Sequence, residues 1–136
     1  SEMCIRDRRQ CGRSGFQGRP EKDADTCYSF WCGATAKILG CHVYIDKPSD
    51  VCWILSAQSP MGGIAKIPGD TPDILHSYLS YVALAMHLED KDEQLEKLPA
   101  LAPVSASLNV SRATLSWIQA NVWTHRGSND DVMSIP

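Results

Sequence analysis

Residues 15–31 read GFQGRPEKDADTCYSFW, and this stretch decides the fold. Its first half is rich in glycine, proline and charge, which predicts a loop. Asp25 is a good N-cap, so we expect a helix over residues 26–39 that stops at Gly40. Shifting the chain by 48 residues places this stretch on residues 63–79, which overlap the segment 62–78, GGIAKIPGDTPDILHSY. The matched pairs are Gln10 with Gln58, Gly15 with Gly63, Phe16 with Ile64, Pro20 with Pro68 and Asp25 with Asp73. Self-similarity at this period predicts a repeat architecture.

Each repeat is expected to hold two helices, so the predicted class is all-α, built from repeated helical hairpins. Pro48 suits a first helical position and predicts a helix over residues 47–58. A loop follows over 59–72, and Asp73 can cap a third helix that runs to about Leu88. Two hairpins bury little core, so we expect further repeats upstream.

The last third of the chain is more polar. Residues 89–107 are expected to form a linker, because prolines break any helix there. Asn109 or Ser111 is expected to cap a last helix through Trp123, with Leu115 and Ile118 facing inward. No alternating pattern typical of a strand stands out.

Length and composition limit the class of protein. The chain has 136 residues, the size of one ordinary domain. With 13 basic and 16 acidic residues it is not a strongly basic nucleic-acid binder. No apolar run approaches the roughly 20 residues of a membrane span. The six cysteines come without an export signal, so we expect free thiols in a reducing, cytoplasmic compartment.

Both ends of the chain look different from the middle. Residues 1–8, SEMCIRDR, resemble a translated sequencing adapter and are expected to be non-native. Residues 124–136 are polar and end in proline, which is typical of a disordered tail.

The repeat predicts that three chemically reactive side chains meet. Asp25 and Cys27 start one helix, and His76 lies in the first turn of the equivalent helix of the next hairpin. Packed helices lie roughly 8–10 Å apart, so the three side chains could converge as a zinc triad with an open fourth position. The alternative is that Asp25 is only a cap, Cys27 a small buried apolar residue and His76 an ordinary polar side chain.

Cations and aromatic side chains flank this predicted triad. Arg19 and Lys22 come just before the helix start and could bind phosphate; the alternative is a solvated basic loop. Tyr28, Phe30 and Trp31 follow and could line an apolar pocket or belong to the core. These elements together fit the transfer of a prenyl group to cysteine. The metal would activate the thiol, the cations would stabilise the departing diphosphate, and the aromatic side chains would hold the hydrocarbon.

The segments 15–31 and 62–78 resemble the β subunits of protein prenyltransferases, and the similarity runs from about residue 9 to residue 110. Gln17 together with Pro20 is most like the type I geranylgeranyltransferase subtype. The resemblance implies an α-α toroid, of which residues 9–123 would be the C-terminal part. Farnesyl-type and Rab-type β subunits remain alternatives, as does a non-catalytic helical-repeat scaffold or a degenerate product.

The resemblance also implies roles for individual residues. Zn²⁺ would be bound by Asp25, Cys27 and His76. The residues implied for the other ligands are Arg19, Lys22 and Tyr28 for the diphosphate, Trp31 for the isoprenoid, and Leu75 and Leu79 for the peptide. The implied partners are a prenyltransferase α subunit, geranylgeranyl diphosphate and proteins that end in a CaaX motif. Asp23-Ala24, Ile64 and Leu79 depart from the usual family pattern, and this chain alone is expected to be inactive.

Overall fold

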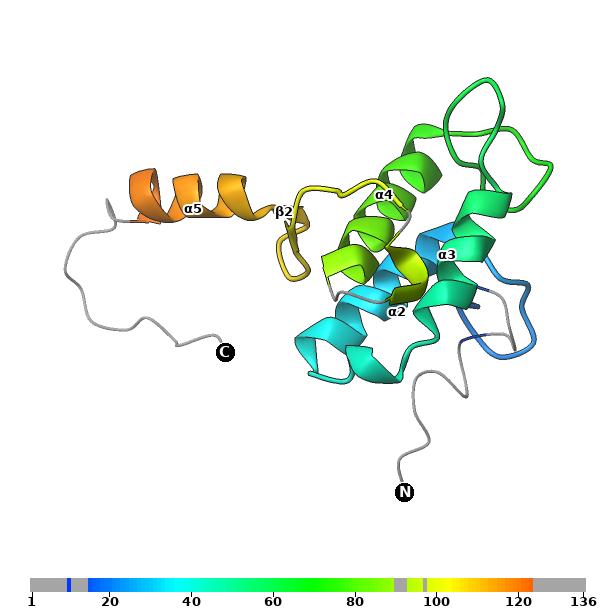
Figure 1. The fold of residues 1–136 in the computed structure, drawn as a ribbon, viewed down its shortest axis with the longest axis horizontal. Coiled ribbons are helices and arrows are strands. Elements are labelled where there is room, and N and C mark those ends of the chain that lie inside the picture. Colours follow the sequence, from blue (N-terminus) through cyan, green and yellow to red (C-terminus); the bar gives the residue numbers. More distant parts are fainter. Residues whose placement is uncertain (1–9, 11–14, 90–92, 97, 124–136) are drawn as a thin grey trace.

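The computed structural model describes residues 10, 15–89, 93–96 and 98–123 (Figure 1). The expectations for residues 1–8 and 124–136 lie outside these ranges. The α-helices are α2 (Thr26–Ile38), α3 (Lys47–Ser56), α4 (Ile74–Glu89) and α5 (Arg112–Asn121). Two short 3₁₀ helices, η1 (His42–Tyr44) and η2 (Glu93–Leu95), and two strands, β1 (Val104–Ser105) and β2 (Val110–Ser111), complete the elements. The predicted all-α class is confirmed.

Helices α2, α3 and α4 pack around one hydrophobic core (Figure 1). Helix α2 lies along α4, and α3 packs against both. The first turns of α2 and α4 meet at Asp25 and His76, and their last turns meet at Lys37 and Glu89, so the two helices run parallel. The most buried side chains of the core include Ile54 and Met86, each 0% exposed. The parallel pair is what brings two helix N-termini to one place.

The helix ends follow from local sequence. The Asp25 side chain accepts a hydrogen bond from the Cys27 N–H, and α2 ends before Gly40, whose φ of 70° is in the left-handed region. Both features were predicted. Helix α3 begins after Asp46, whose side chain caps the Ser49 N–H, with Pro48 in its first turn. The sequence predicts that this helix extends to residue 58. Helix α3 ends two residues earlier, because Gln58 instead pairs with Ile64 in an isolated β-bridge.

The repeat is visible in the backbone. Gln10 pairs with Phe16 in an isolated antiparallel bridge, and Gln58 pairs with Ile64 in the equivalent one. Phe16 and Ile64 are 0% and 1% exposed, so both anchor their loops in apolar packing. The two glutamines differ, however. The Gln10 side chain is hydrogen-bonded to the backbone of Asp46 in both directions, whereas Gln58 is exposed.

The segment after α4 holds structure that the sequence did not predict. The expected linker over 89–107 contains η2 and β1, and β1 pairs antiparallel with β2. Two-residue strands are too short to leave an alternating pattern. The Tyr78 hydroxyl of α4 donates to the Asn109 carbonyl at 2.8 Å and holds the turn between the strands. Asn109 itself has a φ of 53°, typical of a turn residue, so Ser111 is the cap of α5.

Helix α5 lies apart from the three packed helices and contacts β1 and β2 (Figure 1). No residue of α5 is fully buried, so the expectation that Leu115 and Ile118 face inward holds only in part: both are half-buried. The aromatic residue Trp117 is 61% exposed. No helix among the described residues is both long enough and apolar enough to span a membrane.

Glu89, at the end of α4, joins four elements. Its carboxylate contacts Lys37 of α2 at 2.5 Å, accepts the Val104 N–H of β1 at 2.8 Å, and lies 3.6 Å from Arg112 of α5. Burial alone would raise the pKa of this carboxyl, but the bond to Lys37, the Val104 N–H and Arg112 outweigh it and hold the pKa below its ordinary value.

We predict that Glu89→Gln destabilises the chain at neutral pH more than at acid pH. A carboxyl whose pKa is lower in the folded state stabilises the fold above its unfolded pKa of about 4.5, and that contribution is lost as the pH falls through the folded pKa. Urea unfolding followed by circular dichroism at pH 7 and pH 3 measures the difference. Glu96→Gln, at an exposed glutamate, is the control; an equal loss for Glu89→Gln at both pH values would contradict the prediction.

Candidate metal centre and adjoining basic pocket

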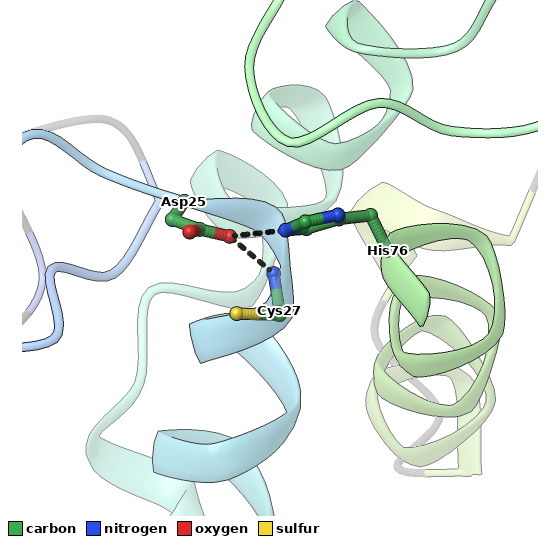
Figure 2. Close-up of side chains that lie close together, drawn as sticks. All are labelled: Asp25, Cys27 and His76. Carbon is green, nitrogen blue, oxygen red and sulfur yellow. Dashed lines mark hydrogen bonds and ion pairs between the residues drawn. The ribbon is translucent and has the colours of Figure 1, made fainter. Parts of the chain in front are cut away.

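Asp25, Cys27 and His76 come together where α2 and α4 begin (Figure 2). Asp25 lies just before α2, Cys27 in the first turn of α2 and His76 in the first turn of α4. One ligand atom from each of the three lies within 4.8 Å of the other two. Asp25 Oδ1 is 3.3 Å from His76 Nε2. The convergence that the repeat predicted is therefore present in the structure.

Asp25 caps α2 and also faces His76, so its role as a cap does not exclude a role as a metal ligand. Its Oδ1 accepts the Cys27 N–H at 3.0 Å and so caps α2, and the same oxygen faces His76. Its Oδ2 lies 3.9 Å from Lys66 Nζ. The residue is 9% exposed, so this carboxylate is held by several donors at the edge of the core.

Cys27 is buried beneath this carboxylate. Burial raises the pKa of its thiol to about 12, and the hydrogen bond to Asp25 and the charge of Asp25 add to the shift. The thiol is therefore protonated at neutral pH when no cation is beside it. A divalent cation would displace this proton, since thiolate is the form that binds metal.

Asp73 fixes the orientation of His76. Its Oδ1 accepts the His76 N–H at 2.9 Å, which caps α4, and its Oδ2 contacts His76 Nδ1 at 2.5 Å. Because a carboxylate only accepts, Nδ1 donates to Asp73, and Nε2 is the ring nitrogen that faces Asp25 and is left to bind a metal. The same bonds hold the pKa of Asp73 below its ordinary value. Metal-ligating histidines commonly donate their second ring nitrogen to a carboxylate in this way.

The donor set fits a catalytic zinc ion. One thiolate, one imidazole nitrogen and one carboxylate oxygen are ligands that Zn²⁺ accepts in tetrahedral sites. Three protein ligands leave the fourth position open for a further ligand, as in catalytic rather than structural sites. Among the described residues this is the one group of three or more such side chains that lies close enough to hold a metal.

A basic pocket of about 530 Å³ adjoins the three ligands and shares Asp25 with them. We call it the basic pocket for its three cations, Arg19, Lys22 and Lys66; three carboxylates, Asp23, Asp25 and Asp70, also line it. The Tyr28 ring forms part of the wall. Gly18 lies directly against that ring: a Cβ there would come 2.2 Å from Tyr28 Cζ, so only glycine allows the loop this close.

The residues expected to bind hydrocarbon and peptide have different surroundings. Trp31 is 52% exposed and packs edge-on against Phe30 at a centroid distance of 4.9 Å. It lines a separate groove of about 350 Å³ together with Ile38 and Leu108. Leu75 is 57% exposed on the first turn of α4. Leu79, in contrast, is 3% exposed and belongs to the hydrophobic core, so it offers no open surface.

Sequence reasoning missed two residues of this site. Lys66 lines the basic pocket and faces Asp25, and its only signal was a cation in the loop that precedes Asp73. The sequence analysis assigns Asp73 only the role of a cap and misses its contact with the His76 ring. Its spacing of three residues from His76, which places both on one helix face, could have indicated that contact.

The fold and the site define the class: repeated helical hairpins in which the parallel helices α2 and α4 begin at a group of three possible metal ligands, beside the basic pocket. A sequence model of the Prenyltransferase alpha-alpha toroid domain matches residues 5–110. The chain belongs to this family.

Named relatives agree with this assignment. The chain is 46% identical over 78 residues to the geranylgeranyl transferase type-1 subunit beta of Arabidopsis thaliana, covering 57% of this chain and 21% of the relative. It is 41% identical over 100 residues to the protein of the same name from Dictyostelium discoideum, covering 73% and 26%. Candida albicans protein geranylgeranyltransferase-I complexed with GGPP matches with a TM-score of 0.65 and 28% identity, covering 77% of this chain and 28% of that one. The chain thus spans about a quarter of the length of these proteins.

We predict that Asp73→Asn weakens Zn²⁺ binding roughly 10–100-fold, the usual effect of losing a partner of a metal-binding histidine. When the oxygen of the substituted amide caps the His76 N–H, the amide nitrogen faces Nδ1 and donates to it. That bond places the ring proton on Nε2, the nitrogen that faces Asp25 and would bind the metal. Competition with a chromophoric chelator measures the affinity.

Asp46→Asn is the matched control, because Asp46 caps α3 as Asp73 caps α4 but lies outside both the three-ligand group and the basic pocket. A zinc affinity of Asp73→Asn within twofold of this control would contradict the positioning role of Asp73.

Proposed function

We propose that this chain is the C-terminal part of a zinc-dependent β subunit of a protein geranylgeranyltransferase of type I. The reaction would transfer a geranylgeranyl group from its diphosphate to the cysteine of a C-terminal CaaX motif. The observation that carries the proposal is that Asp25 belongs both to the metal-ligand group and to the wall of the basic pocket. A centre that activates a thiol and a site that binds an anion would therefore be adjacent.

Asp25, Cys27 and His76 would hold the zinc ion. Zn²⁺ bound there would lower the pKa of a substrate thiol, so that it reacts as a thiolate. In the transfer, a bond forms between the substrate sulfur and C1 of the prenyl group, the bond from C1 to oxygen breaks, and diphosphate leaves. The thiol proton passes to solvent.

The basic pocket would bind the diphosphate. Arg19, Lys22 and Lys66 line one cavity with the carboxylates of Asp23, Asp25 and Asp70, and the three cations would stabilise the anion that develops on the leaving group. The Tyr28 hydroxyl is a neutral donor at the same wall. Lys66 lines the pocket and lies 3.9 Å from Asp25, the residue that the pocket shares with the ligand group.

Exposed apolar side chains would hold the hydrocarbon and the peptide. Trp31 and Leu75 present large apolar surfaces on α2 and α4, and such surfaces are suited to an isoprenoid or an aliphatic side chain. Leu79 would support them from the core rather than contact substrate.

The relatives support the type and the partners. The two named curated relatives are both type-1 β subunits, and the solved structure is named as a complex with GGPP. A β subunit implies an α subunit, and we propose a heterodimer that acts in the cytosol. Because the chain spans about a quarter of these proteins, we propose that it is inactive without the remaining repeats.

The test is reconstitution of the chain, joined to the upstream repeats of its native message, with a prenyltransferase α subunit. We expect about one zinc per heterodimer and transfer of labelled geranylgeranyl from its diphosphate to a CaaX peptide ending in leucine. Cys27→Ala should abolish zinc binding and transfer, whereas Cys52→Ser, at an exposed cysteine outside the site, should retain both. Zinc-free protein without transfer would favour the scaffold alternative, and preference for a 15-carbon donor would favour the farnesyl type.

We predict that Arg19→Ala and Lys22→Ala each weaken binding of inorganic diphosphate roughly tenfold, because each removes a charge-assisted hydrogen bond. Isothermal titration of the reconstituted heterodimer with diphosphate measures the effect. Lys47→Ala removes one positive charge from the start of α3, outside the lining of the pocket, and should leave the affinity within twofold. Equal losses for all three variants would contradict a specific anion site.

A further inference from the structure

A buried polar network joins the three packed helices away from the metal ligands. Asp50 of α3 is 0% exposed. Its Oδ1 accepts the hydroxyl of Ser29 from α2 at 2.7 Å, and its Oδ2 lies 2.8 Å from Nε2 of His87 on α4. Ser29 and His87 are also 0% exposed. One carboxylate is therefore bonded to both of the helices that supply the metal ligands.

The hydrogen-bonding capacity of each group fixes the direction of these bonds. A carboxylate only accepts, so Nε2 of His87 carries a proton. Nδ1 of the same ring is buried without a hydrogen-bond partner among the described atoms, so a second ring proton there would lack an acceptor. The ring stacks on that of His42 at a centroid distance of 5.2 Å. Asp50 thus accepts from both Ser29 and His87, and it lies in the first turn of α3, where the helix dipole favours negative charge.

Stability alone is a weak reason for such a network. Taking a carboxylate out of water is costly, and well-packed apolar side chains of similar volume often stabilise a core equally well. Hydrophobic packing is non-directional, whereas hydrogen bonds to a fixed carboxylate allow only one arrangement of the groups that make them. The distinctive contribution of this network is therefore the relative placement of α2 and α4.

The metal ligands depend on that placement. Cys27 lies two residues before Ser29 on α2, and His76 lies on the helix that carries His87. Metal–ligand distances tolerate shifts of only about 0.2 Å, so sliding of α2 along α4 would separate the ligands.

We infer that Asp50, Ser29 and His87 are positioning residues for the metal centre. By bonding both helices, Asp50 sets the register of α2 against α4, and hence the spacing between Cys27 and His76. This inference rests on the zinc site of the proposed function.

The test compares Zn²⁺ affinity and the visible spectrum of the Co²⁺-loaded protein for variants of the full chain. His87→Leu removes the donor to Asp50, and we expect roughly tenfold weaker Zn²⁺ binding and a weaker thiolate-to-cobalt charge-transfer band. His87→Gln keeps an amide N–H of similar reach and should restore both within about threefold. Ser29→Ala removes the other bond and should weaken binding in the same direction, in a variant whose core is little disturbed.

Ile54→Ala is the matched control. Ile54 is fully buried on α3, one turn after Asp50, and its truncation lowers stability without changing the network. We expect this variant to lose stability to urea as His87→Leu does, but to bind zinc like the unchanged protein. If the unchanged chain binds zinc, and His87→Leu, Ser29→Ala and Ile54→Ala all bind it with equal affinity, the positioning role is wrong but the zinc site stands. A chain that binds no zinc would overturn the site itself, and the positioning role with it.

Discussion

The parallel packing of α2 on α4 is the constraint on which the rest of this structure depends. Each helix starts with an aspartate cap, Asp25 for α2 and Asp73 for α4. Because the helices run side by side in the same direction, both caps and both first turns lie at one edge of the core. The ligand group and the basic pocket are consequences of that arrangement.

Capping aspartates carry a second function here. The free N–H groups at a helix N-terminus need a hydrogen-bond acceptor. A carboxylate can supply it with a single oxygen, or with one lone pair of that oxygen. In Asp25 and Asp73 the remaining hydrogen-bonding capacity of the carboxylate faces His76: Asp25 lies beside Nε2, and Asp73 is the partner of Nδ1. The chemistry of the site is thus built on interactions that the helices require in any case.

Much of this could be predicted from the sequence, because the evidence for it is local or periodic. Asp25, Gly40 and Asp73 mark helix ends through their own backbone preferences. The recurrence of Gln10 and Phe16 as Gln58 and Ile64 marks a repeat, and the repeat places Cys27 near His76. The family relationship then follows from the same residues.

What the sequence did not predict depends on contacts between distant residues. Nothing local to Lys66 marks it as a neighbour of Asp25, and nothing local to Asp50 marks its bonds to Ser29 and His87. Leu79 was expected at the substrate surface, but the packing of α4 on α2 places it in the core. The strands β1 and β2 are too short for periodicity, and they form because Tyr78 and Glu89 hold the segment around them.

The measurement that tests the central claim most directly is X-ray absorption spectroscopy at the zinc edge of the chain loaded with one equivalent of Zn²⁺. The account predicts one sulfur ligand at about 2.3 Å and nitrogen or oxygen ligands at about 2.0–2.2 Å, with the sulfur lost in Cys27→Ala. A zinc shell of nitrogen and oxygen alone, or one with several sulfurs, would contradict a centre made by Asp25, Cys27 and His76.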